Sequence, residues 1–393
     1  MNMNNKNWVS VWGNAVSIAE HHPEAYAKYI TLRYPVYIPF DGDTLRFTFD
    51  NYCGSEAVTV TRATVSAATS PVYEKMPLAC PCKKETICDI TFSKNESVTM
   101  EAHQTAVSDP VSFPVKKGMT LTVSLYFADF TLMQSAVLVT GPLSKGFFSL
   151  GDQTHADALP MDTTKTTNGL YFLSNIELMT AEENHTVICY GDSITAGAWP
   201  DYLTLLARQN PDNHTAFIRR ATSGSRVLRQ YECITYDSYG LKGTNRFPHE
   251  IPTTGADTVI IQQGINDIIH PIGIETNPFR PMSDLPTAKE LIDGYRYYIE
   301  EAKKSHLKVY MGTLLPIFGW RTYATFRDDL RNELNAWIRS AKEIDGCIDF
   351  DLALRGSENP SAFREGFDSG DHLHPSSKAY QAMAECAYEV LRK

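Results

Sequence analysis

The pattern of hydrophobic residues changes near residue 184, and this change constrains the fold more than any other feature. Before it, short runs rich in β-branched and aromatic residues alternate closely with Gly, Pro, Asn and Asp, which is typical of an antiparallel β-sandwich. The predicted strands are residues 36–40, 44–49, 57–65, 97–100, 120–127, 135–140 and 170–177. One helical pattern, roughly residues 15–29, precedes them. We therefore expect residues 1–183 to form an all-β, jelly-roll-like sandwich domain.

Strand and helix patterns alternate after residue 184. Apolar runs typical of strands cover 185–190, 215–220, 258–263, 307–314 and 347–350, and helical patterns cover 201–209, 287–305, 324–342 and 376–392. This alternation predicts an α/β domain over residues 184–393, with helices on both faces of a parallel sheet. Ligands in such folds bind at the carboxyl ends of the strands, so the loops there hold the candidate functional residues.

Composition narrows the classes of partner. The 393 residues carry 36 Lys and Arg against 46 Asp and Glu, a net charge of −10, which argues against nucleic acid as a partner. No apolar run is long enough to span a membrane, so no membrane partner is expected. The N-terminus lacks the apolar region and cleavage site of a signal peptide, which predicts a cytoplasmic location. The composition is compatible with a monomer and with a homo-oligomer.

Cysteine spacing gives no sign of a metal site. Eight cysteines without a signal peptide are more typical of reduced thiols than of a disulfide framework. Cys80, Cys82 and Cys88 lie close together in the sequence, but their spacing matches no zinc-binding pair. We therefore expect no metal.

The first two strand-end loops contain a serine and a glycine of interest. Ser193 follows the strand at 185–190 and stands where a helix begins, so its backbone N–H is free to donate; its simpler role is that of a helix N-cap. Thr195 occupies the position where a G-x-S-x-G nucleophile elbow needs glycine, which disfavours an α/β-hydrolase. Gly224 follows the second strand and could equally be an ordinary turn glycine.

The remaining two loops supply an amide and an acid–imidazole pair. Asn266 follows the strand at 258–263, and its side chain either caps a turn or donates to a developing oxyanion. Asp371 and His374 stand three residues apart in a turn, so they can hydrogen-bond and orient the imidazole as a base. Metal binding by His372 and His374 is the alternative, but no further ligand lies at a recognisable spacing.

Together these motifs resemble the SGNH (GDSL-type) hydrolase superfamily. Its four blocks match GDSI at 191–194, the glycine of SGSR at 223–226, GIND at 264–267 and DHLH at 371–374. The spans WPDYL (199–203) and LKVYMGTLLP (307–316) resemble an XynE-like subfamily of bacterial acyl-hydrolases and carbohydrate esterases, in which a β-rich region precedes the hydrolase domain.

The resemblance implies a flavodoxin-like domain and a Ser-His-Asp triad. His374 takes the proton of Ser193, and Asp371 orients His374. The backbone N–H groups of Ser193 and Gly224 and the side-chain amide of Asn266 hold the oxyanion. No metal or organic cofactor is needed.

The resemblance also implies a small-molecule or oligosaccharide ester as substrate, above all acetyl esters of plant-derived oligosaccharides. Trp199, Phe318 and Trp320 could line a substrate or acyl pocket, and Arg226 could contact substrate oxygens, although ordinary core or surface roles fit each of them equally well. Two alternatives are an arylesterase or lipase acting on non-carbohydrate esters, and a carbohydrate-binding protein with an inactive hydrolase half. The complete Ser, Gly, Asn and His set argues against the second.

Overall fold

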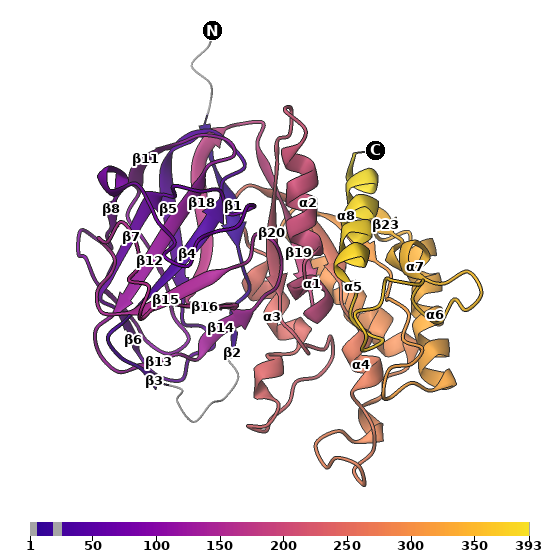
Figure 1. Ribbon diagram of the computed structural model, residues 1–393. Coiled ribbons are helices and arrows are strands. Elements are labelled where there is room, and N and C mark those ends of the chain that lie inside the picture. Colours follow the sequence, from indigo (N-terminus) through magenta and orange to yellow (C-terminus); the bar gives the residue numbers. More distant parts are fainter. Residues whose placement is uncertain (1–5, 19–25, 393) are drawn as a thin grey trace. The chain divides into compact units, whose positions relative to one another are not determined.

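The computed structural model describes residues 6–18 and 26–392, and the chain divides into two compact units (Figure 1). The first unit holds the residues up to Thr186 together with Arg208–Ile218. The second holds Val187–Ala207 and the residues from Arg219 onward. The sequence pattern places a boundary between residues 183 and 184 and gives no indication that Arg208–Ile218 groups with the first unit.

The first unit is built from antiparallel sheets. One sheet has the order β1 (Lys6–Gly13), β18 (Leu173–Ala181), β5 (Gly42–Asp50), β10 (Thr105–Val107), with β11 (Val111–Val115) also paired to β5. The other has the order β16 (Lys165–Thr167), β15 (Gly146–Leu150), β4 (Ile30–Tyr37), β12 (Thr120–Phe127), β7 (Arg62–Ala67), β8 (Cys88–Ile90). Smaller pairings join β13 (Thr131–Leu132) to β3 (Tyr26–Ala27), β6 (Val58–Val60) to β9 (Val98–Met100), and β14 (Ser135–Leu138) to β17 (Gly169–Tyr171) and β2 (Ser17–Ile18).

Alternating side chains of the two large sheets share one hydrophobic core. Along β5, Leu45, Phe47 and Phe49 are buried, while the residues between them are partly exposed, as the two-residue period of a strand requires. Leu121 and Val123 of β12 enter the same cluster from the other sheet. The predicted all-β first region is therefore confirmed.

The predicted helix at residues 15–29 is wrong in its described parts. Ser17–Ile18 forms β2, which pairs with β14, and Tyr26–Ala27 forms β3, which pairs with β13. Residues 19–25 lie outside the described residues. Pairing with strands more than 100 residues away decides the conformation here, and no local helical period contains that information.

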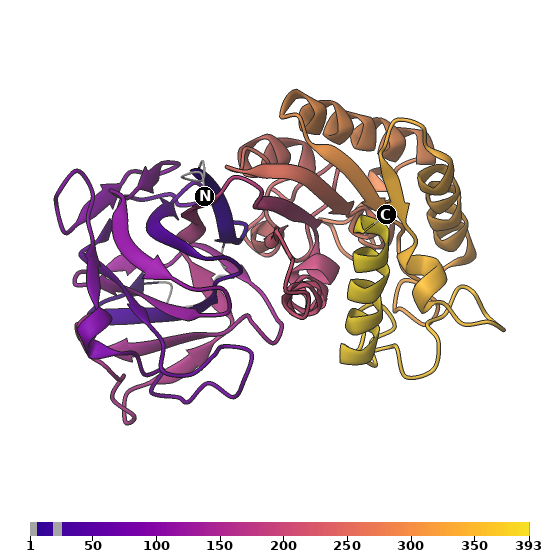
Figure 2. The same cartoon turned by 90° about the horizontal axis from the view of Figure 1, so that it is seen from above.

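The second unit is a doubly wound α/β domain. Its sheet has the order β20 (Thr215–Ala221), β19 (His185–Gly191), β21 (Ala256–Gln262), β22 (Lys308–Gly312), β23 (Gly346–Ile348), and β21, β22 and β23 run parallel. Numbered along the chain, this is the flavodoxin-like order 2-1-3-4-5. The helices are α1 (Ser193–Ala196), α2 (Trp199–Arg208), α3 (Gly243–Glu250), α4 (Ile265–Ile269), α5 (Ala288–Lys304), α6 (Thr325–Ser340), α7 (Phe350–Leu354) and α8 (Ser377–Leu391). Figure 2 shows α5 on one face of the sheet and α2 and α8 on the opposite face. The predicted fold class is confirmed.

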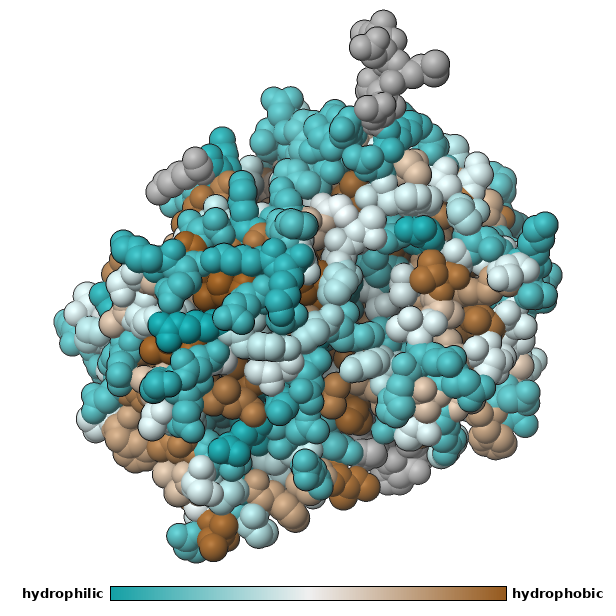
Figure 3. Space-filling model, turned by 180° about the vertical axis from the view of Figure 1, so that it is seen from behind, coloured by the Kyte–Doolittle hydropathy of each residue, from teal (hydrophilic) through white to brown (hydrophobic). Residues whose placement is uncertain are grey.

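Hydrophobic side chains are concentrated inside the molecule. On the face seen in Figure 3, hydrophobic residues form small groups separated by hydrophilic ones. Among the described residues, no helix combines the length and the apolar composition needed to cross a lipid bilayer.

Polar contacts hold three strand ends of the second unit together. Arg246 of α3 is buried and donates to the carbonyl of Gly191 at 2.8 Å and to Thr222 Oγ1 at 3.0 Å. Thr195 Oγ1 donates to Gln262 Oε1 at 3.1 Å. The loops that follow β19, β20 and β21 are therefore fixed relative to one another.

Candidate active site

Ser193 is the first residue of α1, directly after β19. The side chain of Asp192 caps this helix by accepting a hydrogen bond from the Ile194 amide at 3.0 Å. The Ser193 amide lies too early in the helix for an intrahelical acceptor, and none is found elsewhere in the described chain. The end of β19, the Asp192 cap and the start of α1 therefore place the hydroxyl and the free backbone N–H of Ser193 close together.

The structure brings Ser193, His374 and Asp371 into direct contact. Ser193 Oγ lies 2.9 Å from His374 Nε2. On the other side of the ring, His374 Nδ1 lies 2.6 Å from Asp371 Oδ2. With a proton on Nδ1, Nε2 is free to accept the proton of the serine hydroxyl.

Asp371 is held in its charged form. Burial raises the pKa of its carboxyl, but hydrogen bonds from the His374 side chain and from the His374 and Leu373 amides outweigh this effect and lower the pKa to about 2. The carboxylate is therefore ionised at every pH at which the protein would be assayed, and it orients the imidazole.

His372 takes part in a separate acid–imidazole pair. Its Nδ1 lies 2.5 Å from Asp368 Oδ2, and its backbone adopts φ of 65°. A side chain built at Gly319 would meet the His372 ring at 2.8 Å, so the loop after β22 packs against this histidine. None of the contacts found for His372 in the described chain reaches Ser193, in contrast to His374.

The loops with Gly224 and Asn266 are joined to each other. Asn266 Nδ2 donates to the Ser225 carbonyl at 3.1 Å, which uses one of its two N–H bonds. Gly224 has φ of 77°, and a Cβ there would collide with the ring of Tyr239 at 2.4 Å, so glycine is required. The second loop also meets the first, because the Thr222 amide donates to the Gly191 carbonyl at 3.2 Å. The arrangement links the loops of Ser193, Gly224 and Asn266 in one chain of contacts.

Two buried carboxyl groups, those of Asp267 and Asp192, support these loops. The sequence analysis did not predict this role for either of them. Asp267 accepts from the Val227 and Leu228 amides at 2.8 and 3.0 Å, and burial raises its pKa to about 6. Burial also raises the pKa of Asp192 to about 7. The Asp residues in GDSI and GIND were visible signals, whereas nothing in the sequence pointed to Arg246.

Two of the four candidate substrate-binding residues are buried instead. The prediction for Trp199 is wrong: its side chain is fully buried, packs against Phe350 with ring centroids 5.6 Å apart, and so has no surface for a ligand. Arg226, predicted to contact substrate oxygens, is 3% exposed, and its guanidinium is already paired with Asp284 at 3.2 Å. Both positions follow strand ends, where sequence alone cannot tell an inward from an outward side chain.

Phe318 and Trp320 lie on the loop that packs against His372. Phe318 is 47% exposed and contacts Tyr323 edge-on, with ring centroids 5.1 Å apart. Trp320 is partly buried, and the guanidinium of Arg321 lies 4.7 Å from its ring centroid. These two aromatics stay candidates for substrate contact.

No group of three or more His, Cys, Asp and Glu side chains suited to a metal ion occurs among the described residues. All of the site contacts described above involve only side chains and backbone of the second unit.

Comparison with known proteins identifies the kind of domain. Residues 189–382 match the model of the GDSL-like lipase/acylhydrolase family. The chain thus contains a domain of the GDSL/SGNH hydrolase superfamily. This is a family of acylhydrolases and esterases, and the match ends within α8.

Several solved structures resemble about half of the chain. A GDSL-like lipase from Bacteroides thetaiotaomicron is 20% identical, covering 54% of this chain and 89% of that one, with a TM-score of 0.39. A variant of an acetyl xylan esterase from Geobacillus stearothermophilus is 17% identical over 53% and 95%, with a TM-score of 0.40. A lipolytic protein of the G-D-S-L family from Veillonella parvula is 17% identical over 53% and 99%, with a TM-score of 0.35. No curated protein matches the sequence.

Proposed function

We propose that this protein is a serine esterase with Ser193 as nucleophile, His374 as general base and Asp371 as the residue that orients the base. The observation that carries the proposal is the continuous hydrogen-bonded line from Ser193 Oγ through both ring nitrogens of His374 to Asp371 Oδ2, with links of 2.9 and 2.6 Å. A nucleophile–base–orienting-acid line of this kind is the requirement for acyl transfer through a covalent intermediate.

The reaction proceeds in two halves. His374 Nε2 takes the proton as Ser193 Oγ forms a bond to the ester carbonyl carbon, and the same proton then passes to the departing alcohol oxygen as the C–O bond breaks. Water next attacks the acyl-serine, His374 takes a proton from the water, and the carboxylic acid leaves as Ser193 regains its proton. Asp371 stays ionised throughout and stabilises the imidazolium.

Three N–H donors are proposed to hold the negative oxygen of each tetrahedral intermediate. They are the backbone amides of Ser193 and Gly224, which have no acceptor in the described chain, and the second N–H of the Asn266 side chain. Each such donor contributes about 3–4 kcal/mol to transition-state stabilisation in related acyl-transfer sites.

The proposed substrates are short-chain esters, above all acetyl groups on plant-derived oligosaccharides. The support is the resemblance of WPDYL and LKVYMGTLLP to the XynE-like subfamily, to which we propose this chain is most closely related. An arylesterase or lipase acting on non-carbohydrate esters is the second candidate, favoured by the family match, which is to lipases and acylhydrolases alike.

The nucleophile is tested with Ser193→Ala on 4-nitrophenyl acetate. We expect the variant to lose at least about 10⁴-fold in kcat while unfolding at the same denaturant concentration. Ser340→Ala serves as the matched control, since Ser340 is an exposed serine of α6, and it should keep full activity. Full activity in Ser193→Ala overturns the proposal.

The substrate class is tested with two series of esters. An acetylesterase should lose activity steeply from 4-nitrophenyl acetate to the octanoate, whereas a lipase should gain. Release of acetate from acetylated xylo- and manno-oligosaccharides, compared with phenyl acetate, then separates carbohydrate from aryl specificity. No acetate from any oligosaccharide contradicts the carbohydrate assignment and leaves the esterase assignment intact.

A further inference from the structure

A pocket of about 720 Å³ opens in the second unit beside the candidate active site. Aromatic and cationic side chains line much of it: Tyr236, Tyr239, Arg280, Arg321, Tyr323 and Phe326. They come from the segment after β20, the loop after α4, the loop between β22 and α6, and the first turn of α6, which holds Phe326. No sequence motif singled out this combination.

The pocket shares a wall with the proposed oxyanion site. Tyr239, which lines the pocket, lies against Gly224, since a Cβ on that glycine would meet the Tyr239 ring. Tyr239 also packs against His270, with ring centroids 5.2 Å apart. The His270 amide donates to the Asn266 carbonyl at 3.1 Å, so the pocket wall continues directly into the Asn266 helix. A ligand in the pocket therefore lies next to the proposed acyl-transfer centre.

Arg280 is the unusual residue of this pocket. It is 7% exposed, and its Nε has no hydrogen-bond partner in the described chain. Its guanidinium lies 4.4 Å from the ring centroid of Tyr236 and 5.9 Å from that of Tyr239. No carboxylate among the described residues forms an ion pair with it. Aromatic rings, rather than an acid, thus hold a buried cation at the pocket wall.

The acid closest to Arg280 in the sequence, Asp284, is already engaged. Asp284 pairs with Arg226 at 3.2 Å and with Arg229 at 3.4 Å. Arg321, which also lines the pocket, is exposed, and the contact found for it in the described chain is with the ring of Trp320. With Arg280 and Arg321 both lacking an acidic partner in the described chain, the pocket has a surplus of positive charge, although the whole chain carries a net charge of −10.

Two buried donors on neighbours of the lining residues, which do not line the pocket themselves, also lack partners among the described residues. The buried Nε1 of Trp320 has none in the described chain, and neither does the Oη of Tyr231, whose ring lies 4.3 Å from the Arg226 guanidinium. Buried donors without acceptors are costly unless a ligand supplies the acceptors. At the pocket itself, the surplus of positive charge and the unpartnered Nε of Arg280 call for an oxygen-rich anion.

We propose that this pocket binds the anionic group of an acidic sugar carried by the ester substrate. A carboxylate or phosphate would be gripped by the planar fork of Arg280 and by Arg321, and the Tyr236 and Tyr323 rings would pack against the apolar face of the sugar. The position beside Gly224 makes the pocket a specificity site of the proposed esterase, and in that respect the inference rests on the proposed function.

The binding claim is tested without catalysis, in the Ser193→Ala protein. Calorimetric titrations with glucuronate, glucose 6-phosphate and glucose separate the carboxylate source from the phosphate source and from the neutral sugar. We expect one anion to bind at least 10-fold more tightly than glucose, and added salt to weaken it. Equal binding of glucose, or no binding of either anion, overturns the inference.

Substitutions assign the effect to the pocket. Arg280→Gln and, separately, Arg321→Gln should each weaken anion binding about 10-fold and leave glucose unaffected. Arg296→Gln is the matched control, because Arg296 is an exposed arginine of α5 paired with Asp293 and Glu343. Arg321 is exposed, so its variant tests the pocket even if Arg280→Gln does not fold. Unchanged binding in both folded variants contradicts the proposal.

A kinetic comparison in the protein that retains Ser193 tests whether anion binding in the pocket affects ester hydrolysis. Acetylated methyl glucuronoside should have a higher kcat/KM than acetylated methyl glucoside, and Arg280→Gln should remove the difference. If neither ester is hydrolysed while glucuronate still binds, the proposed carbohydrate-ester specificity fails and the assignment of anion binding to the pocket stands. If both are hydrolysed equally, the pocket assignment fails and the esterase stands.

Discussion

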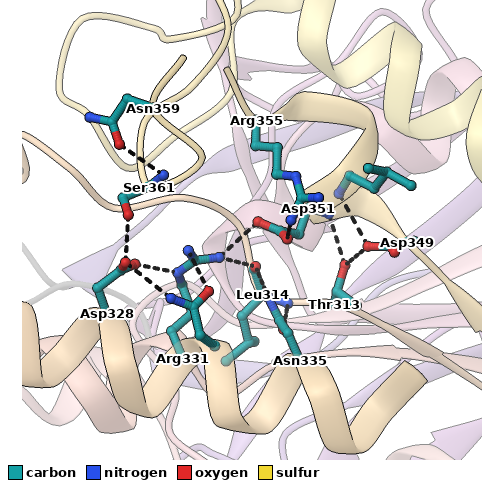
Figure 4. A network of polar contacts seen from close by, with 12 residues as sticks. Thr313, Leu314, Asp328, Arg331, Asn335, Asp349, Asp351, Arg355, Asn359 and Ser361 are labelled. Carbon is teal, nitrogen blue, oxygen red and sulfur yellow. Dashed lines mark hydrogen bonds and ion pairs between the residues drawn. The ribbon is translucent and has the colours of Figure 1, made fainter. Parts of the chain in front are cut away.

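Two regions at the carboxyl edge of one sheet differ in how completely their charged and polar side chains are paired. Beyond β22 and β23, Arg331 is 1% exposed and donates to Asp328 at 2.7 Å and to Asp351 at 2.8 Å (Figure 4). Asp351 also accepts from Arg339 and Arg355. Figure 4 shows Arg331 lying between Asp328 and Asp351, and the charges of these three side chains are all paired.

Beyond β19, β20 and β21 the pairing is incomplete. The Ser193 amide and one N–H of the Asn266 side chain have no acceptor in the described chain, and Arg280 has no acid there. The pKa values show the same contrast. Asp349, in the paired region, has a lowered pKa because hydrogen bonds and charge from Arg339 outweigh its burial, whereas burial raises the pKa of Asp192. Saturated groups stabilise a fold, and unsaturated groups are available to a ligand.

The paired region still affects the open one through a single loop. Ser361 Oγ donates to Asp328 at 2.6 Å, and the Ser361 carbonyl accepts from the Phe318 amide at 2.7 Å. This anchors the loop with Phe318 and Trp320 that packs against His372. The network thus positions one wall of the site without taking part in its chemistry.

The largest effect expected from the open region is on activity. His374→Ala should lower kcat on 4-nitrophenyl acetate by about 10⁴-fold or more, because the base of the proposed triad is lost. Its free energy of unfolding should change by less than about 1 kcal/mol, since the ring is partly exposed and its one strong partner, Asp371, can be solvated. A large loss of stability together with near-normal kcat would erase the distinction between the two regions.

The matching substitution in the paired region should have the opposite effect, a large loss of stability with little change in kcat. Arg331→Met leaves Asp328 without its buried cation, and we expect a loss of about 3–5 kcal/mol in the free energy of unfolding. The folded fraction should keep kcat within a few-fold. Denaturant titration measures the loss, with Arg296→Met as the control on an exposed arginine. An unchanged unfolding midpoint would show that the ion network is not structural.

Removing the side-chain donor of Asn266 should lower activity less than removing the base. Asn266→Ala is expected to lower kcat by about 10²–10³-fold, with little change in KM, because an oxyanion donor acts mainly in the transition state. Stability should fall by about 1 kcal/mol through loss of the bond to the Ser225 carbonyl. A rise in KM with constant kcat would assign Asn266 to ground-state binding instead.

The buried Asp192 predicts a pH effect on stability. Its folded-state pKa of about 7 lies above the ordinary value near 4, so the stability linked to its protonation is present below pH 4 and is lost as pH rises through 7. Asp192→Asn should therefore flatten this decline and be more stable than the parent at pH 8 by on the order of 2 kcal/mol. Parallel pH–stability curves for the two proteins would contradict the assignment.

The smallest effect is expected from the second acid–imidazole pair. His372→Ala should keep activity within a few-fold, because His372 pairs with Asp368 and makes no contact with Ser193 among those found in the described chain. Comparison with His374→Ala under identical conditions checks it. If His372→Ala is inactive and His374→Ala is active, the base has been assigned to the wrong histidine.

The order of elements and the identity of the contacting residues followed from the sequence, because both rest on local patterns. Strand and helix periods predicted α5 at residues 287–305, and the strand at 120–127 coincides with β12. Asp371 and His374, three residues apart, are joined by a turn that the sequence largely determines. The sequence did not predict which distant strands pair, as β2 and β3 show. It also did not predict α3, the helix whose Arg246 donates to the Gly191 carbonyl.

The amino-acid sequence by itself determined an α/β domain after a β-rich region, and a serine, an amide and an acid–imidazole pair placed after three different strands of that domain. Only the tertiary structure decided which polar side chains turn inward and which stay open. It buries Trp199 and pairs Arg226 with Asp284, while it leaves Arg280 at a pocket wall without an acid in the described chain. The reason is physical: a side chain's partners come from segments far away in the chain, and burial and charge pairing exist only once those segments have packed together.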